Sequence, residues 1–253
     1  MKKNLRSQQG FTLIELIVVM AILTILSGLI IPKLDVFKLK ANKAQSAANM
    51  SGVDRFVASY KVQRDLFPDG NDSLLEDGTN TFYAQLDPQL TGSTTGSPTK
   101  LTTTTIANDS ELRSLQRVGL TTVNDHDPAA GFPGDSAAGT TPRTLAVNDT
   151  IATINAADSD GQAILRHLYP QTDGVVPANE KVVVFGLGPR NAMIPDTLHV
   201  APFYANTAQT SYYNRFLLCY ALDTGGGRAR FLAALGSDAD TISEEINEFY
   251  EIN

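Results

Sequence analysis

The feature that most constrains this 253-residue chain is an apolar run near its N-terminus. From Phe11 to Ile31, a stretch of 21 residues, the only charged residue is Glu15. As an α-helix this stretch measures roughly 32 Å, which is enough to cross the hydrocarbon core of a bilayer. A carboxylate inside such a helix costs about 2.5–3.5 kcal/mol on insertion. The run therefore predicts a membrane-spanning helix in which Glu15 is either a charge tolerated close to the membrane surface or a functional group.

A short basic leader precedes the apolar run and ends at Gly10. It contains Lys2, Lys3 and Arg6 and no acidic residue. A secretory signal peptide has a shorter apolar region of about 7–15 residues and then a small-residue cleavage site. This run is longer and is followed directly by a proline and a lysine, so a secretory signal is a poor match. A plain uncleaved anchor is the remaining alternative, and lysines on both sides of the run do not decide its orientation.

The sequence Gly10-Phe11-Thr12-Leu13-Ile14-Glu15 resembles the processing site of type IV pilins and of type II secretion pseudopilins. The resemblance implies that a prepilin peptidase removes the leader, residues 1–10, by cutting between Gly10 and Phe11. It further implies N-methylation of Phe11 and a pairing of Glu15 with the terminal ammonium of a neighbouring subunit during assembly. In hydrocarbon, two opposite charges cost less together than apart, which agrees with this role.

Pro32 follows the apolar run and predicts a kink or a local break in the helix, since proline lacks the N–H and its ring clashes with the preceding turn. The resemblance matches Pro32 to a proline that accompanies partial melting of the helix inside filaments. Beyond it, apolar residues recur at steps of three and four, so residues 33–64 are expected to form an amphipathic half of the same helix. Turn residues at 67–70 end this pattern.

Residues 65–253 are expected to form one globular head. Within residues 84–168 the only aromatic residue is Phe132, and twelve of the fifteen residues 91–105 are Thr, Ser or Gly, which predicts a loop-rich insert. A short helix is expected over 160–169. Residues 181–235 predict a β-sheet with strands at 181–187, 215–222 and 228–235, the last two joined by a glycine-rich hairpin.

The fold class predicted from these patterns is α+β. A long N-terminal helix, membrane-spanning in its first half and amphipathic in its second, packs on a C-terminal antiparallel sheet, as in pilins. The tail after residue 236 contains six acids and no base and is expected to form a short amphipathic helix that docks its apolar side.

Composition excludes several functions. The head is strongly acidic, which argues against a general nucleic-acid binder, because such proteins need a basic face. Cys219 is the only cysteine, so no intrachain disulfide can form. In the family that the sequence resembles, many type IV pilins close a C-terminal loop with a disulfide, so within this resemblance a single cysteine favours pseudopilins, or pilins stabilised in another way. The three histidines share no metal-ligand spacing, and no nucleophile, base or metal set can be assembled, so a membrane-anchored enzyme is disfavoured and we expect no enzymatic activity.

Closely spaced acids are a weaker signal for a cation. They do not complete a calcium loop of the EF-hand type, which needs further ligands and a bidentate acid. The resemblance nevertheless makes calcium a candidate ligand, because some major pseudopilins bind it in the head. The candidate ligands are Asp158, Asp160, Asp238 and Asp240.

The function expected from the resemblance is that of a structural subunit of a type IV pilus-like or type II secretion pseudopilus filament. Its expected location is the bacterial inner membrane, with the head outside the cytoplasm, and then an extracytoplasmic filament. Its expected partners are other copies of itself, the prepilin peptidase, an inner-membrane assembly platform with its ATPase, minor pilins and the lipid bilayer. The alternative is a minor or tip pilin whose head binds a surface, a substrate or DNA.

The charge distribution yields a first prediction. Residues 33–64 carry a net charge of +5, whereas residues 65–253 carry −14. In a filament the acidic head of one subunit would lie near the basic stalk of another, so opposite charge would help to set their register. We expect filaments to dissociate more readily as the salt concentration rises, which sedimentation of sheared filaments at low and high ionic strength measures. Equal stability at both would contradict this role.

Overall fold

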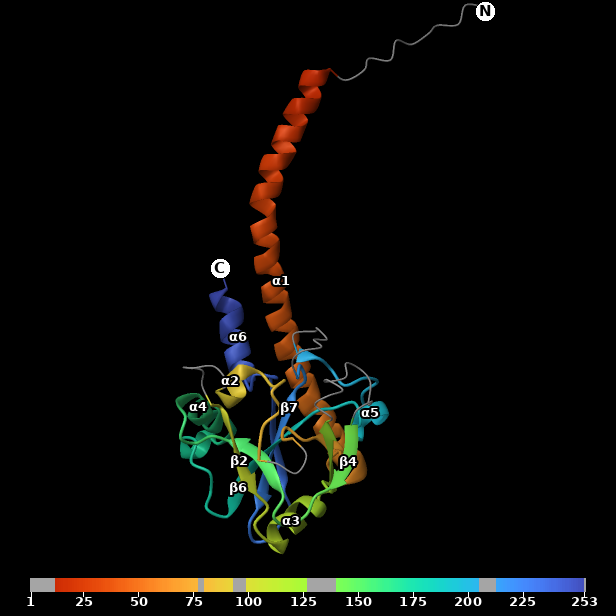
Figure 1. Ribbon diagram of the computed structural model, residues 1–253, viewed down its shortest axis with the longest axis vertical. Helices are drawn as coiled ribbons and strands as arrows, with labels where there is room; N and C mark the ends of the chain where they lie inside the picture. The colour runs from red at the N-terminus through yellow and green to blue at the C-terminus, as the bar shows by residue number, and fades with distance from the viewer. Residues whose placement is uncertain (1–11, 77–79, 93–98, 127–139, 205–212, 253) are drawn as a thin grey trace, which may run out of the picture.

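One helix, α1 (Leu13–Arg64), determines the shape of the molecule (Figure 1). The computed structural model describes residues 12–76, 80–92, 99–126, 140–204 and 213–252. With 52 residues, α1 is about 78 Å long, and its first half projects away from the head. It is long and apolar enough to span a membrane, and side chains such as Leu13 and Ile25 are exposed. The predicted helix and its apolar half are therefore present.

The apolar half of α1 satisfies its own polar groups. The hydroxyl of Thr24 donates to the backbone oxygen of Met20 at 2.8 Å, and that of Ser27 donates to Leu23 at 2.7 Å. Because each of these two hydroxyls bonds to a carbonyl oxygen of the preceding turn, neither lacks a hydrogen-bond partner in lipid.

The helix is continuous through Pro32, and Figure 1 shows α1 curving gently rather than breaking. The local break predicted at Pro32 is therefore absent from the single chain. A proline removes one hydrogen bond of the ladder, and the flanking turns maintain the helix around it. Melting at this position inside a filament stays a prediction.

The head is built on an eight-stranded, curled, mixed sheet. The path of paired strands is β2-β5-β6-β1-β3-β4, and β7 pairs with both β6 and β8. All pairs are antiparallel except β1 with β3, which is parallel, so the sheet is not the purely antiparallel one predicted. The strands are β1 (Asn71–Asp72), β2 (Leu101–Thr105), β3 (Thr122–His126), β4 (Thr140–Thr144), β5 (Thr150–Ile154), β6 (Glu180–Gly186), β7 (Leu217–Asp223) and β8 (Arg230–Leu235). A long helix packed on this sheet confirms the pilin-like α+β class.

The predicted loop-rich insert at 84–168 is wrong for its described part. That part contributes four strands and three helices to the head: β2 to β5, α2 (Pro88–Thr91), α3 (Asp109–Gln116) and α4 (Ser159–Leu168). The threonine-rich segment 101–105 forms β2 and pairs with β5 along its whole length, from Leu101↔Ile154 to Thr105↔Thr150. Threonine is β-branched and favours strands, a preference that a count of apolar residues does not register. Phe132 and the residues 93–98 lie outside the described residues.

The other predicted elements are confirmed. Strands β6, β7 and β8 match the three predicted strands, α4 matches the helix expected near 160–169, and α6 (Ile242–Glu251) matches the helix expected in the acidic tail. The hairpin between β7 and β8 is closed by Asp223, whose Oδ1 accepts hydrogen bonds from the N–H groups of Gly225 and Gly227. Gly226 has a φ of 85°, which favours glycine at that position. The remaining short elements are η1 (Pro170–Thr172) and α5 (Met193–Asp196).

The central strands β6 and β7 are buried on both faces, which explains why their sequences are nearly continuously apolar. Along β6, Val183 and Phe185 join the core beneath α1, whereas Val182 and Val184 join a second core with α4. On the α1 side this core contains Met50, Val53 and Val57. The Asp54 carboxylate also accepts a hydrogen bond from the N–H of Ala234 at 2.8 Å, so α1 is joined to β8 by both apolar and polar contacts.

The second prediction concerns this attachment. Met50 is 1% exposed, and we expect Met50→Ala to lower the free energy of unfolding by about 2–5 kcal/mol because it leaves a cavity in the core. Val62, on the same helix, is 85% exposed, so Val62→Ala should change stability by no more than about 0.5 kcal/mol. Urea denaturation of the full chain in detergent, followed by circular dichroism, measures both. Equal effects of the two substitutions would contradict the packing of α1 on the sheet.

Candidate functional site

The N-terminus of α1 places Glu15 in a defined position. Thr12 is the N-cap residue, and its hydroxyl accepts a hydrogen bond from the Glu15 N–H at 3.3 Å. In return, Oε2 of Glu15 accepts hydrogen bonds from the N–H and the hydroxyl of Thr12, each at 2.8 Å. This reciprocal capping box satisfies two backbone donors, and it holds the carboxylate where the helix dipole favours negative charge.

The geometry leaves one oxygen of the Glu15 carboxylate for a further partner. Both bonds from Thr12 end at Oε2 and the side chain is exposed, so the capping box does not use Oε1. Gly10 and Phe11, where cleavage and methylation are predicted, lie outside the described residues. The described part of the motif therefore contributes an oriented carboxylate one turn from the predicted cleavage position.

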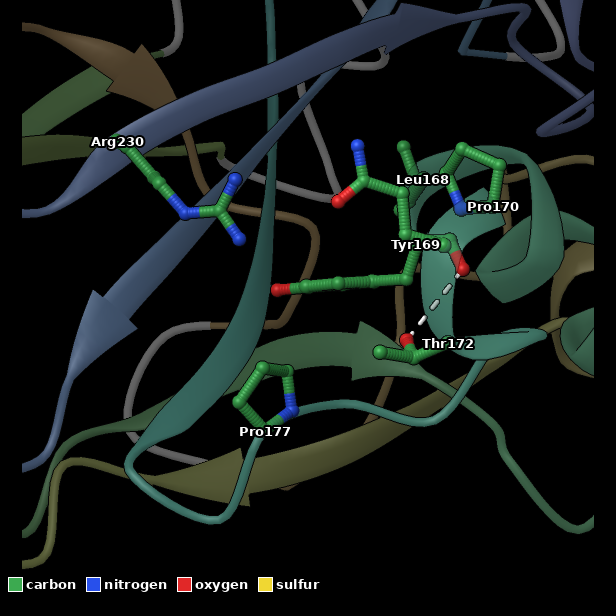
Figure 2. A pocket seen from close by; sticks show the side chains of 7 residues that line it. Leu168, Tyr169, Pro170, Thr172, Pro177 and Arg230 are labelled. Carbon is green, nitrogen blue, oxygen red and sulfur yellow. Dashed lines mark hydrogen bonds between the residues drawn. The ribbon is translucent and has the colours of Figure 1, made fainter.

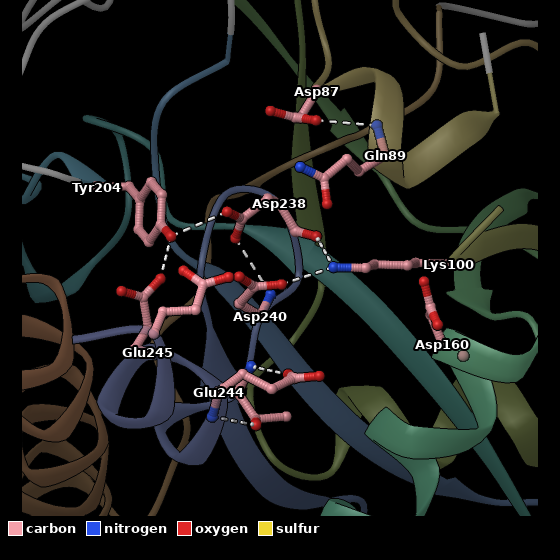
Figure 3. A network of polar contacts seen from close by, with 12 residues as sticks. Asp87, Gln89, Lys100, Asp160, Tyr204, Asp238, Asp240, Glu244 and Glu245 are labelled. Carbon is pink, nitrogen blue, oxygen red and sulfur yellow. Dashed lines mark hydrogen bonds and ion pairs between the residues drawn. The ribbon is translucent and has the colours of Figure 1, made fainter. Parts of the chain in front are cut away.

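A second cluster of charged groups lies inside the head, between α1 and α6 (Figure 3). Asp238, Asp240 and Glu245 are buried, and one carboxylate oxygen of each lies within 4.8 Å of the others. Sequence spacing identified the first two as candidates. It did not identify Glu245, which lies on α6. The fold of α6 places the Glu245 carboxylate close to the loop that precedes this helix.

Two lysines and a tyrosine surround these carboxylates. The ammonium of Lys100 lies 2.6 Å from Oδ1 of Asp240 and donates to the backbone oxygen of Asp238 at 3.0 Å. Lys43, from α1, lies 3.4 Å from Glu245 and also pairs with Glu248. The Tyr204 hydroxyl contacts both Asp238 and Glu245. The network thus joins α1, β2 and α6 through charge-assisted hydrogen bonds.

The same geometry tests the calcium prediction. Calcium prefers six to eight oxygen ligands, and this cluster offers carboxylate, backbone and hydroxyl oxygens close together. The Lys100 ammonium, however, already donates to the Asp240 carboxylate and to the backbone oxygen of Asp238, so a cation bound by these two oxygens would compete with it. Asp158 and Asp160 do not belong to this group of three carboxylates: Asp158 is the N-cap of α4, and it accepts a hydrogen bond from the N–H of Asp160 at 2.9 Å.

Burial shifts the protonation of two of these acids. Desolvation, together with the neighbouring Asp240, raises the pKa of Asp238 to about 6. Desolvation also raises the pKa of Glu245 to about 7, although Tyr204 and Lys43 oppose the shift. Oε2 of Glu245 is buried and has no hydrogen-bond partner among the described residues, which is consistent with a carboxyl group that is protonated more readily than usual.

The remaining chemistry-bearing residues have structural positions. Cys219 is buried in β7, and burial raises the pKa of its thiol, so the inert thiol predicted from the sequence fits its surroundings. His126 lies beside Asp72 with Nε2 and Oδ2 3.2 Å apart, and both are buried. Tyr213 donates to the same Asp72 oxygen at 2.9 Å. Sequence reasoning missed this cluster because the parallel pairing of β1 with β3, which creates it, leaves no local signal.

An open pocket of about 250 Å³ lies on the surface of the head beside Tyr169 (Figure 2). The Arg230 guanidinium lies 5.4 Å from the centroid of the Tyr169 ring, and two prolines, Pro170 and Pro177, complete the apolar lining. The pocket combines an aromatic face with the polar groups of Gln171 and Thr172, so it can accept a small group of mixed character.

The N-terminal site of this chain is similar to a known family motif. The profile described as the prokaryotic N-terminal methylation motif matches residues 5–31. This range contains the predicted cleavage position and Glu15. The N-terminal resemblance to pilins and pseudopilins is thereby confirmed.

The chain is also similar to curated proteins of this class. It is 32% identical over 81 residues to the type II secretion system core protein G of Vibrio cholerae, which covers 31% of this chain and 56% of that protein. It is 29% identical over 82 residues to PilA4, the type IV wide pilus major component of Thermus thermophilus. This alignment covers 32% of this chain and 63% of that protein. The core protein G of Escherichia coli K12 is 33% identical over 67 residues, which cover 26% of this chain and 46% of that protein. The chain thus spans about half the length of the curated relatives it matches, and no solved structure gives a significant match.

The third prediction concerns the buried acid Glu245. Its folded pKa of about 7 lies above its value in the unfolded chain, so the unfolded state loses this proton first as the pH rises. The contribution of Glu245 to folding is therefore greatest below pH 4 and is lost as the pH rises to about 7.

We expect Glu245→Gln to remove this dependence. As the pH increases from 4 to 8, the unfolding free energy of this variant should increase by about 2–3 kcal/mol relative to that of the original chain. Glu251→Gln, which changes an exposed acid of the same helix, is the control and should leave the pH dependence unchanged. Chemical denaturation at several pH values measures the difference, and parallel curves for Glu245→Gln and the original chain would contradict the assignment.

Proposed function

We propose that this protein is a structural subunit of a type IV pilus-like or type II secretion pseudopilus filament. The observation that carries the proposal is a coincidence at one place: the methylation motif, matched over residues 5–31, contains a carboxylate that is oriented at the start of a continuous 52-residue helix. The relatives support it, since their names describe a secretion-system core protein and a major pilus component.

In this proposal the apolar residues 11–31 hold the subunit in the inner membrane with its head outside the cytoplasm. The prepilin peptidase cuts between Gly10 and Phe11, and methylation of Phe11 follows. The subunit then leaves the bilayer for a bundle of parallel helices, assisted by an inner-membrane platform and its ATPase. In the bundle the Phe11 ammonium of one copy binds Glu15 of its neighbour, which neutralises two charges that hydrocarbon disfavours.

The N-terminus of the mature protein tests the proposal. Mass spectrometry of membrane and sheared surface fractions, from cells with and without the prepilin peptidase, should find a chain that begins at N-methylated Phe11 only when the peptidase is present. An intact Met1 or a cut beyond Ile31 would overturn the filament function and leave an anchored or secreted domain.

The fourth prediction isolates the charge of Glu15. Glutamine at this position can still close the capping box, so Glu15→Gln keeps the local helix start and removes only the charge. An unpaired ammonium in hydrocarbon costs about 2.5–3.5 kcal/mol, and we expect the yield of sheared filaments to fall at least about tenfold. Leader cleavage and membrane insertion should continue.

The matched control for this prediction is Asp109→Asn, which removes an exposed acid from α3 of the head, outside the apolar run. It should assemble like the original chain. If Glu15→Gln also assembled normally, the role of the carboxylate in docking would be refuted.

The second candidate function is that of a minor or tip subunit whose head binds another molecule. The pocket beside Tyr169 favours it, because the pocket lies on the head and is open to a ligand. Abundance separates the two candidates: a major subunit makes up most of the sheared filament mass, whereas a tip subunit is scarce in it.

A further inference from the structure

Helices α1 and α6 enclose an apolar groove that the chain itself leaves open. The groove has a volume of about 300 Å³, and its apolar lining comes from Ala44 and Ala47 of α1 and from Ile246, Phe249 and Tyr250 of α6. Ile246 is 44% exposed and Tyr250 is 74% exposed. The apolar side of α6 therefore docks on α1 only in part.

The stalk carries an exposed stripe of matching character. Leu34 is 57% exposed and Phe37 is 66% exposed, although both belong to the half of α1 outside the apolar run. The neighbouring Lys33 and Lys38 are also exposed and form no ion pair with any residue that the structure describes. The stalk therefore exposes a stripe of apolar and basic side chains. The apolar groove between α1 and α6 is exposed as well.

The charges of the two surfaces are complementary. Helix α6 contains Glu244, Glu245, Glu248 and Glu251 and no basic residue. Lys43 of the same chain neutralises part of this charge through Glu245 and Glu248, whereas Glu251, the last residue of α6 and next to Tyr250 of the groove, is exposed. A basic helix fits this end of the groove, and a surface of anionic lipid does not.

The pairing of Glu15 with a neighbour's ammonium, which belongs to the proposed function, sets the register of two copies. Phe11 of one copy beside Glu15 of the next is a stagger of four residues, or about 6 Å along parallel helices. Residue 37 of the staggered copy then lies level with residue 41 of the first. In the first copy the Lys40 ammonium lies 5.9 Å from the Phe249 ring centroid, so residue 41 is level with the groove. Figure 1 shows α6 beside α1 at this height, on the side of the head that faces the apolar half of α1.

We propose that the groove between α1 and α6 of one copy receives residues 33–38 of the stalk of a second copy, with Phe37 against Tyr250 and Lys33 near Glu251. This inference rests on the proposed filament function and names the surface through which the head of one subunit holds its neighbour. Helix α6 then forms part of the contact that holds two copies together.

Cross-linking between copies tests the contact. The variant with Phe37→Cys and Tyr250→Cys is expressed as full chain, and filaments are sheared and oxidised with copper phenanthroline. Cys219 is buried, so it does not compete. We expect ladders of covalent dimers and higher oligomers in filaments. The matched control, Phe37→Cys with Val175→Cys, places the second thiol at a position that is 66% exposed and distant from α6, and it should give none.

A charge exchange keeps the test informative where the cysteine variant assembles poorly. Lys33→Glu should lower filament yield several-fold, and adding Glu251→Lys should restore it, whereas Glu251→Lys alone should resemble Lys33→Glu. Processed subunits that form filaments without specific cross-links and without charge rescue would overturn this contact and leave the filament function intact. Failure of leader cleavage would overturn both. An environment-sensitive dye at residue 250 that reports lipid rather than protein contact in assembled filaments would likewise overturn the contact.

Discussion

The apolar half of α1 requires a non-aqueous partner, and the rest of the structure depends on this requirement. Its described side chains are exposed in the single chain, and no described residue of the head covers them. The only environments that satisfy such a helix are a bilayer or other helices of the same kind. In the second half of α1 the apolar side chains are covered instead, because Met50, Val53 and Val57 are buried beneath the sheet. One helix therefore joins a segment that must leave water to a head that folds in it.

The parts of the molecule that could be predicted from the sequence are those encoded locally. The processing motif, the length of the apolar run, the strands near 181–235 and the short helix α4 each depend on residues close together in the chain. The insert could not be recognised, because β2 is made of threonines whose strand character appears only once β5 pairs with it. The carboxylate of Glu245 and the ammoniums of Lys43 and Lys100 meet only through the tertiary fold. Local spacing found Asp238 and Asp240 but gave no indication that lysines would neutralise them.

The buried charges have a structural consequence that reaches the surface. Lys43 connects α1 to the first and second turns of α6 through Glu245 and Glu248, so the orientation of α6 is fixed by an ion pair as well as by apolar packing. A buried carboxylate with few donors is costly, and proteins with such groups often gain a defined arrangement rather than stability. Here the arrangement that is gained is the open groove between α1 and α6. A purely apolar interface would allow α6 to slide along the stalk and close it.

In the filament function proposed above, transfer from membrane to filament would present a selectivity problem that apolar contacts alone cannot solve. Lipid tails are as apolar as leucine side chains, so moving the first half of α1 from lipid into a bundle changes little hydrophobic free energy. The preference for the bundle must come from groups whose environment does change. Glu15 is one, since the capping box leaves one of its oxygens for a neighbour's ammonium. The outer face of α6 is another, since Ile246 and Tyr250 are in water before assembly and would be covered after it. A polar contact at the start of α1 and a second contact at residues 33–38 would then define one register, and a register fixed at two points resists slippage of parallel helices better than a uniform apolar seam.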